Sequence, residues 1–96
     1  MSEVDQKARE VFRAAAEFYE TGGEWGQGVS THRPNTYCLS EALSFILNGS
    51  GWGPEVQAHA HFLFRKKIKL GVVLFNDMTT TTKDHIIRVC KEIAAE

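Results

Sequence analysis

The stretch Phe75-Asn76-Asp77-Met78-Thr79-Thr80-Thr81-Thr82 marks an abrupt change from apolar to polar residues near the end of the chain. The residues just before it are continuously apolar, and so short an apolar run predicts an extended, buried segment over residues 70–75. Beyond the break, Thr81 and Asp84 have the spacing of a capping box. This pattern predicts a final helix over residues 82–95.

Helical periodicity predicts three further helices, over residues 3–21, 36–48 and 54–67. In the first of them, the apolar residues fall at the spacings of one helical face: Val4, Ala8, Val11, Phe12, Ala15, Phe18 and Tyr19. Ser2 and Asp5 precede that face with capping-box spacing, which indicates where the helix begins.

The second predicted helix has a clear apolar stripe, whereas the third is ambiguous. The stripe consists of Leu39, Ala42, Leu43, Ile46 and Leu47. As a helix, residues 54–67 place Val56, Ala60, Leu63 and Phe64 on one face; as a strand, Ala58, Ala60, Phe62 and Phe64 alternate with polar residues. Pro54 at the first helical position and the basic residues at the end favour the helix.

The sequence as a whole predicts a small, mainly α single domain over residues 1–96, with about four helices and minimal β pairing. We expect the extended segment 70–75 to cross the core and to pair with part of residues 25–31. The predicted core consists of Phe12, Ala15, Trp25, Leu43, Ile46, Leu74, Ile86, Val89 and Ile93. Residues 22–35 form a long glycine-rich loop, and such loops are usually functional or held by a large anchor such as Trp25.

Composition favours a soluble, cytoplasmic protein. The chain has 96 residues, of which 43% are hydrophobic and 24% charged, with a net charge of −1. This charge gives no reason to expect nucleic acid or an anionic membrane as partner, and the basic residues 65–69 are typical of a solvated helix end. No apolar stretch approaches the length of a membrane span, and the two cysteines lie in predicted helices, as in a reduced intracellular protein.

Three motifs in order resemble a known family. An amphipathic first helix is followed by Trp25-Gly26-Gln27-Gly28, then by Cys38-Leu39-Ser40-Glu41-Ala42-Leu43, and then by the Phe75-Asn76-Asp77 step. This order is similar to that of short bacterial and phage proteins, common in actinobacteria, that form a domain family of unknown function. Members usually have Trp at the position of Phe75 and Pro-Gly near Met78. The resemblance implies a compact helical domain and no particular activity.

Cys38 is the candidate nucleophile of the chain. A thiol near a helix N-terminus can have a lowered pKa, and a histidine with an asparagine would complete a hydrolase-like arrangement. His59, His61 and Asn76 are the candidates for those roles. No local cysteine signature surrounds Cys38, so a small buried side chain is the simpler interpretation.

His59 and His61 could share a metal only if their segment were a strand, because residues two apart on a helix point in different directions. Carboxylate or thiol partners at ligand spacing are also missing, so no metal site is expected. The chain has no phosphate-binding glycine motif that ends in Lys-Ser or Lys-Thr, and we expect no cofactor.

The remaining candidates are polar or aromatic residues beside turns: Trp25, Gln27, Trp52, Asn76 and Asp77. Asn76 and Asp77 can either cap a chain reversal or line a polar pocket with Gln27, His32 or a histidine of residues 59–61. The tryptophans can pin loops or contact a partner. We expect a non-enzymatic protein-binding domain that uses these five residues, in the manner of a phage inhibitor of a host defence complex. The alternative is a hydrolase or transferase that uses Cys38.

Overall fold

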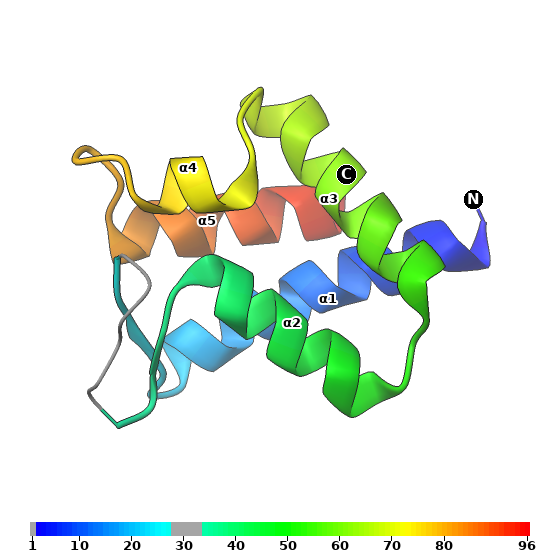
Figure 1. Ribbon diagram of the computed structural model, residues 1–96, viewed down its shortest axis with the longest axis horizontal. Coiled ribbons are helices and arrows are strands. Elements are labelled where there is room, and N and C mark those ends of the chain that lie inside the picture. Colours follow the sequence, from blue (N-terminus) through cyan, green and yellow to red (C-terminus); the bar gives the residue numbers. More distant parts are fainter. Residues whose placement is uncertain (1, 28–33) are drawn as a thin grey trace.

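The computed structural model describes residues 2–27 and 34–96 and is mainly helical (Figure 1). Its elements in chain order are α1 (Glu3–Glu20), β1 (Glu24–Trp25), β2 (Thr36–Tyr37), α2 (Leu39–Ser50), α3 (Pro54–Ile68), α4 (Val72–Asn76) and α5 (Lys83–Ala95). The predicted class is confirmed, since these helices form a small mainly α unit with a minimal β pair. The ambiguous residues 54–67 belong to a helix.

Helix α1 is the centre of the fold, because α5, α3 and α2 all pack against it. It runs antiparallel to α5, and α2 and α3 cover its other sides (Figure 1). The side chains that pack together around it are almost completely buried, among them Ala8, Val11, Phe12, Leu39, Phe64, Ile86 and Ile93. The predicted helical faces therefore supply most of this core.

The helix ends follow the capping chemistry of their sequences, with a shift of one residue at α5. The Ser2 hydroxyl accepts a hydrogen bond from the Asp5 amide at 3.0 Å. At α5 the cap is Thr82, whose side chain accepts from the His85 amide at 3.2 Å. Thr81, the residue predicted to cap, is buried, and its hydroxyl instead donates to the Phe75 carbonyl.

Helix α2 begins three residues later than predicted, with Cys38 as its cap. The reason is that Thr36 pairs with Glu24 in a parallel two-stranded sheet and is not free to start a helix. Asn35 has a left-handed backbone with φ of 58°, and its side chain donates to the Gly22 carbonyl at 3.0 Å. Of the segment 25–31, the part that the structure describes therefore pairs with β2 and not with residues 70–75.

Residues 70–75 were predicted to be extended, and this prediction is wrong. The Phe75 amide donates to the Gly71 carbonyl at 3.0 Å and the Asp77 amide to the Val73 carbonyl at 3.1 Å, as in an α-helix. Buried backbone groups need partners. Because β1 pairs with β2, the short helix α4 satisfies the backbone groups of this segment internally.

Leu74 was predicted to lie in the core and is instead 66% exposed. A single-turn helix can bury only one face, and α4 buries the face with Val72, Phe75 and Asn76. Two other predicted core residues, Trp25 and Ile46, are half-buried and pack against the edge of the core.

Candidate functional site

Asn76 is the most highly connected polar side chain in the described part of the chain. It is 1% exposed, and its Oδ1 accepts from Trp25 Nε1 at 2.5 Å and from the Leu39 amide at 2.9 Å. Its Nδ2 donates to the Gly26 carbonyl at 3.1 Å and to Asp77 Oδ1 at 3.2 Å. The amide thereby joins β1 and the start of α2 to the end of α4.

Gln27 strengthens the same junction. Its Nε2 donates to the Asn76 carbonyl at 3.1 Å and to the Met78 carbonyl at 2.8 Å. The Thr81 hydroxyl donates to the Phe75 carbonyl at 2.8 Å and closes the turn that follows α4. We call Trp25, Gln27, Asn76 and Asp77 the Asn76 cluster. The structure brings four of the predicted site residues together in it.

The buried polar groups of the Asn76 cluster are hydrogen-bonded to one another and to the backbone. Among the described residues, no buried side-chain nitrogen or oxygen lacks a hydrogen-bond partner. A substrate would have to break these bonds, and leaving a buried polar group unpaired costs about 1–3 kcal/mol. His32, one of the alternative residues for lining such a pocket, lies outside the described residues.

Cys38 is engaged as a helix cap. Its sulfur accepts from the Glu41 amide at 3.5 Å, and its own amide donates to Glu41 Oε1 at 3.0 Å. Burial raises the pKa of the Cys38 thiol above its ordinary value, which opposes the thiolate that catalysis would need. Within residues 2–27 and 34–96, no hydrogen bond joins this sulfur to a histidine.

The contacts of the two histidines of α3 do not include Cys38. His59 Nε2 is 2.8 Å from Asp5 Oδ1 on α1, and its ring stacks on Phe62 with centroids 5.7 Å apart. His61 is half-buried on a different side of the helix. Across the described residues, no three potential metal ligands come together.

Trp52 does not join the other predicted site residues. It lies in the turn between α2 and α3, and its half-buried ring packs against the core. Its amide donates to the Ser50 hydroxyl at 3.4 Å. This placement matches a residue that pins a glycine-rich turn.

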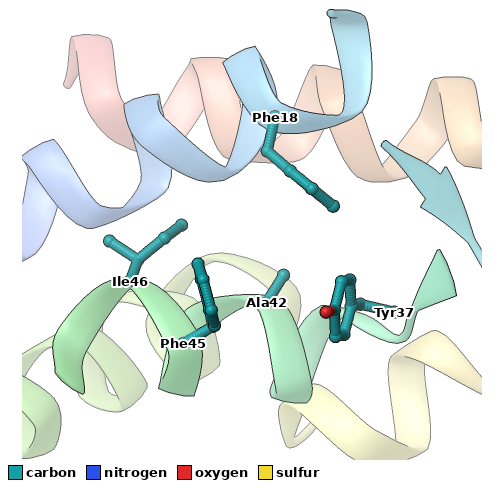
Figure 2. Close-up of a pocket in the computed structure, with 5 residues that line it drawn as sticks. All are labelled: Phe18, Tyr37, Ala42, Phe45 and Ile46. Atoms are coloured by element: carbon teal, nitrogen blue, oxygen red, sulfur yellow. The ribbon is translucent and has the colours of Figure 1, made fainter. Parts of the chain in front are cut away.

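An apolar pocket that the sequence did not indicate opens between α1, β2 and α2 (Figure 2). Its volume is about 190 Å³, and the residues that line it are Phe18, Tyr37, Ala42, Phe45 and Ile46. Phe18 reaches into it from α1, while the other side chains rise from β2 and α2 on the opposite side (Figure 2). Only apolar surface faces the opening.

Three rings form the walls of this pocket, which we call the Phe45 pocket. Phe18 and Tyr37 have ring centroids 5.6 Å apart, and Tyr37 and Phe45 have theirs 6.2 Å apart. Phe45 is 68% exposed, the highest value among the large hydrophobic side chains of the described residues. Gly23 makes room for Phe18, since a Cβ at Gly23 would lie 2.4 Å from that ring.

A signal for the Phe45 pocket exists in the sequence but is weak. Phe45 lies outside the apolar stripe of α2, so it is an aromatic residue on the polar face of a helix. Single exposed hydrophobic residues are common on protein surfaces, and this one becomes distinctive only when Tyr37 and Phe18 are placed beside it.

Other hollows lie along α1, α3 and α5, and charged side chains take part in the lining of each. One of them is formed by Arg13, Lys91, Ala94 and Ala95. Its cations already have partners, since Lys91 Nζ is 2.6 Å from Glu20 Oε2 and Arg13 pairs with Glu10.

Comparison with known proteins finds no family model, no curated protein and no solved structure that matches this chain. Among the described residues, no helix has both the length and the apolar character that crossing a membrane requires.

Proposed function

We propose that this domain is a non-enzymatic module that binds a protein partner through the Phe45 pocket. The observation that carries the proposal is a wholly apolar opening beside a phenylalanine that is 68% exposed. Exposed aromatic residues next to small apolar pockets are typical of the centres of protein interfaces.

The polar residues that the sequence suggested as site residues support this proposal, because they stabilise the fold. The Asn76 cluster holds β1, α2 and α4 together, so we assign Trp25, Gln27, Asn76 and Asp77 to the scaffold rather than to the binding surface. The alternative function, a hydrolase or transferase that uses Cys38, is weakened by the capping hydrogen bond and the raised pKa of that thiol.

A small domain that binds a protein and covers part of its surface can act as an inhibitor of that protein. The resemblance to short phage and bacterial proteins favours a phage-type inhibitor that covers a surface of a host defence complex. Such a protein needs one firm contact and no catalytic residue. This role remains part of the proposal and depends on the identity of the partner.

The test is affinity capture from a lysate of the source organism with two matched variants. Phe45→Ala removes the exposed ring of the pocket, and Phe62→Ala removes a ring that is 56% exposed on α3 and stacks on His59. Both changes are at exposed helical positions, where stability usually changes by about 0.5 kcal/mol or less. We expect the wild type and Phe62→Ala to retain a stoichiometric protein and Phe45→Ala to lose it.

A partner that is captured equally by both variants would place the interface elsewhere. The absence of any stoichiometric partner would count against a binding function altogether. Hydrolase activity that disappears in Cys38→Ser would support the alternative.

A further inference from the structure

The size of the Phe45 pocket indicates what kind of group it accommodates. Its volume of about 190 Å³ is below the range of about 300–1,000 Å³ that small-molecule sites occupy. An apolar cavity of about 150 Å³ is large enough for a benzene ring. The pocket therefore fits one apolar side chain of a partner and not a whole cofactor.

In the described residues of the segments that line the pocket, the charged side chains are carboxylates, although two lysines of α5 reach Glu20 and Glu24. All five lining residues lie between Phe18 and Ile46. Among the described residues 14–27 and 34–64 there is no lysine or arginine, whereas this part of the chain contains the carboxylates of Glu17, Glu20, Glu24, Glu41 and Glu55. All the lysines and arginines of the described chain lie in residues 7–13 and 65–91.

Two of the carboxylates belong to residues that are close in sequence to pocket-lining residues and lie on the same helices as those residues. Glu17 directly precedes Phe18 on α1. Glu41 is four residues before Phe45 on α2, so Glu41 and Phe45 lie on the same side of α2. Glu41 also accepts a hydrogen bond from the Cys38 amide at 3.0 Å, and Glu20 and Glu24 pair with lysines of α5 at 2.6 and 3.8 Å, which offsets their charge. The nearest formal charges on the pocket's own helices are therefore negative.

We infer that the Phe45 pocket takes a single apolar anchor side chain from a basic segment of a protein partner. This inference rests on the proposed function and names the class of partner. Apolar burial of the anchor supplies most of the affinity, and lysines or arginines beside the anchor are attracted by the surrounding carboxylates. The same carboxylates repel nucleic acid and anionic lipid, which is why a basic protein segment is the preferred occupant.

The test is an NMR titration of the ¹⁵N-labelled protein with designed helical peptides. The peptides share one framework with a central Leu, Phe or Trp and differ only in their flanking residues, which are all Lys or all Glu. A third set has the Lys flanks and Ala at the centre. The signals of Tyr37, Ala42 and Phe45 report on the pocket, and Phe45→Ala and Phe62→Ala serve as the pocket and control variants.

We expect a Lys-flanked peptide with an apolar anchor to shift the pocket signals. Loss of the anchor weakens binding about tenfold or more, as burial of one large apolar side chain implies. Replacement of the Lys flanks by Glu weakens it about fivefold, and added salt reduces that difference, as for exposed charge pairs. Phe45→Ala removes the shifts and Phe62→Ala preserves them.

The failures of the inference and of the proposed function give different results. If Glu-flanked and Lys-flanked peptides bind equally, the pocket is a binding site but the basic partner is wrong. If the pocket signals shift with protein concentration and no peptide, a second copy of the chain is the occupant, and the inference is again wrong. If no anchor of any kind shifts these signals, both the inference and the proposed function lose their site.

Discussion

At the scale of single residues, Asn76 does most to determine how the chain is arranged. Its carboxamide suits this position because the oxygen accepts from both Trp25 Nε1 and the Leu39 amide while the nitrogen donates to the Gly26 carbonyl. An aspartate at this position would lose the donated bonds and would place a charge beside Asp77. Asn76 is therefore a scaffold residue whose removal should be felt in stability.

We predict that Asn76→Ala lowers the free energy of unfolding by about 3 kcal/mol, because it leaves buried donors and an acceptor unpaired. For a domain of this size, that loss lowers the midpoint of thermal unfolding by more than about 10 °C. Circular dichroism during heating measures it. A variant that melts with the wild type would show that the cluster is not what holds β1, α2 and α4 together.

Cys38 provides a second prediction at this scale, because burial raises the pKa of its thiol and so lowers the thiolate fraction at neutral pH. Alkylation of Cys38 by iodoacetamide at pH 7 should be slower than that of a free thiol. Cys90 is the internal control, since its thiol is completely buried and burial raises its pKa to about 12. Peptide mass spectrometry resolves both sites, and rapid labelling of Cys38 would revive the catalytic hypothesis.

Residue types alone suggested the capping character of Asn76 and the anchoring role of Trp25, but not that the two are bonded to each other. Their hydrogen bond spans 51 positions of the chain, and no local pattern records such a contact. The cap of α2 is a related case. Cysteine is not a typical cap, so only the structure identifies Cys38 in that position.

At the scale of elements, α4 shows where local patterns fail. An apolar run of this length is consistent with a buried strand or a buried helix, and periodicity cannot separate them. The decision depends on whether a neighbouring strand is free to pair. Since β1 pairs with β2, residues 72–76 form a helix that exposes Val73 and Leu74.

The two assignments of residues 70–75 predict different costs for truncating Leu74. In the structure Leu74 is 66% exposed while Leu43 is 2% exposed. A leucine-to-alanine substitution at these two positions therefore compares a surface site with a core site. We predict that Leu43→Ala costs about 2–5 kcal/mol and Leu74→Ala about 0.5 kcal/mol or less. Urea denaturation measures both, and comparable losses would indicate that Leu74 is buried after all.

The contact between α1 and α3 yields a prediction about pH. Hydrogen bonds from Arg9 and then His59 hold the pKa of Asp5 below its ordinary value of 3.8. A carboxyl with a lowered pKa in the folded state stabilises the protein above its unfolded pKa, and this contribution is lost as the pH falls through the folded-state pKa.

Asp5→Asn should therefore be less stable than the wild type at pH 7, and the difference should shrink as the pH falls below about 4. The matched control is Glu3→Gln, which removes an exposed carboxylate whose pair with Lys7 is solvated and contributes little. Thermal melts across the pH range test the pair. A stability difference that persists unchanged to the lowest pH would argue against the charge of Asp5 as its cause.

At the scale of the whole molecule, the fold class could be predicted from the sequence and the binding surface could not. Helical periodicity identifies α1, α2 and α5 because each helix buries a face of its own, whereas α3 is identified by the proline at its start and the basic residues at its end. The Phe45 pocket is formed by three elements that meet only after folding. The absence of lysine and arginine from the described residues 14–27 and 34–64 is visible in the sequence, but it acquires meaning only when the pocket is located between α1, β2 and α2.

The central claim is that the polar residues maintain the fold while the Phe45 pocket performs recognition. It is tested most directly by measuring melting temperature and partner capture together for Phe45→Ala and Gln27→Ala. Gln27→Ala removes two hydrogen bonds to backbone carbonyls, at 3.1 and 2.8 Å, and so acts on the scaffold. We predict that Phe45→Ala keeps the melting temperature and loses the partner, whereas Gln27→Ala melts about 4–8 °C lower and keeps it. The reverse pattern would contradict the account.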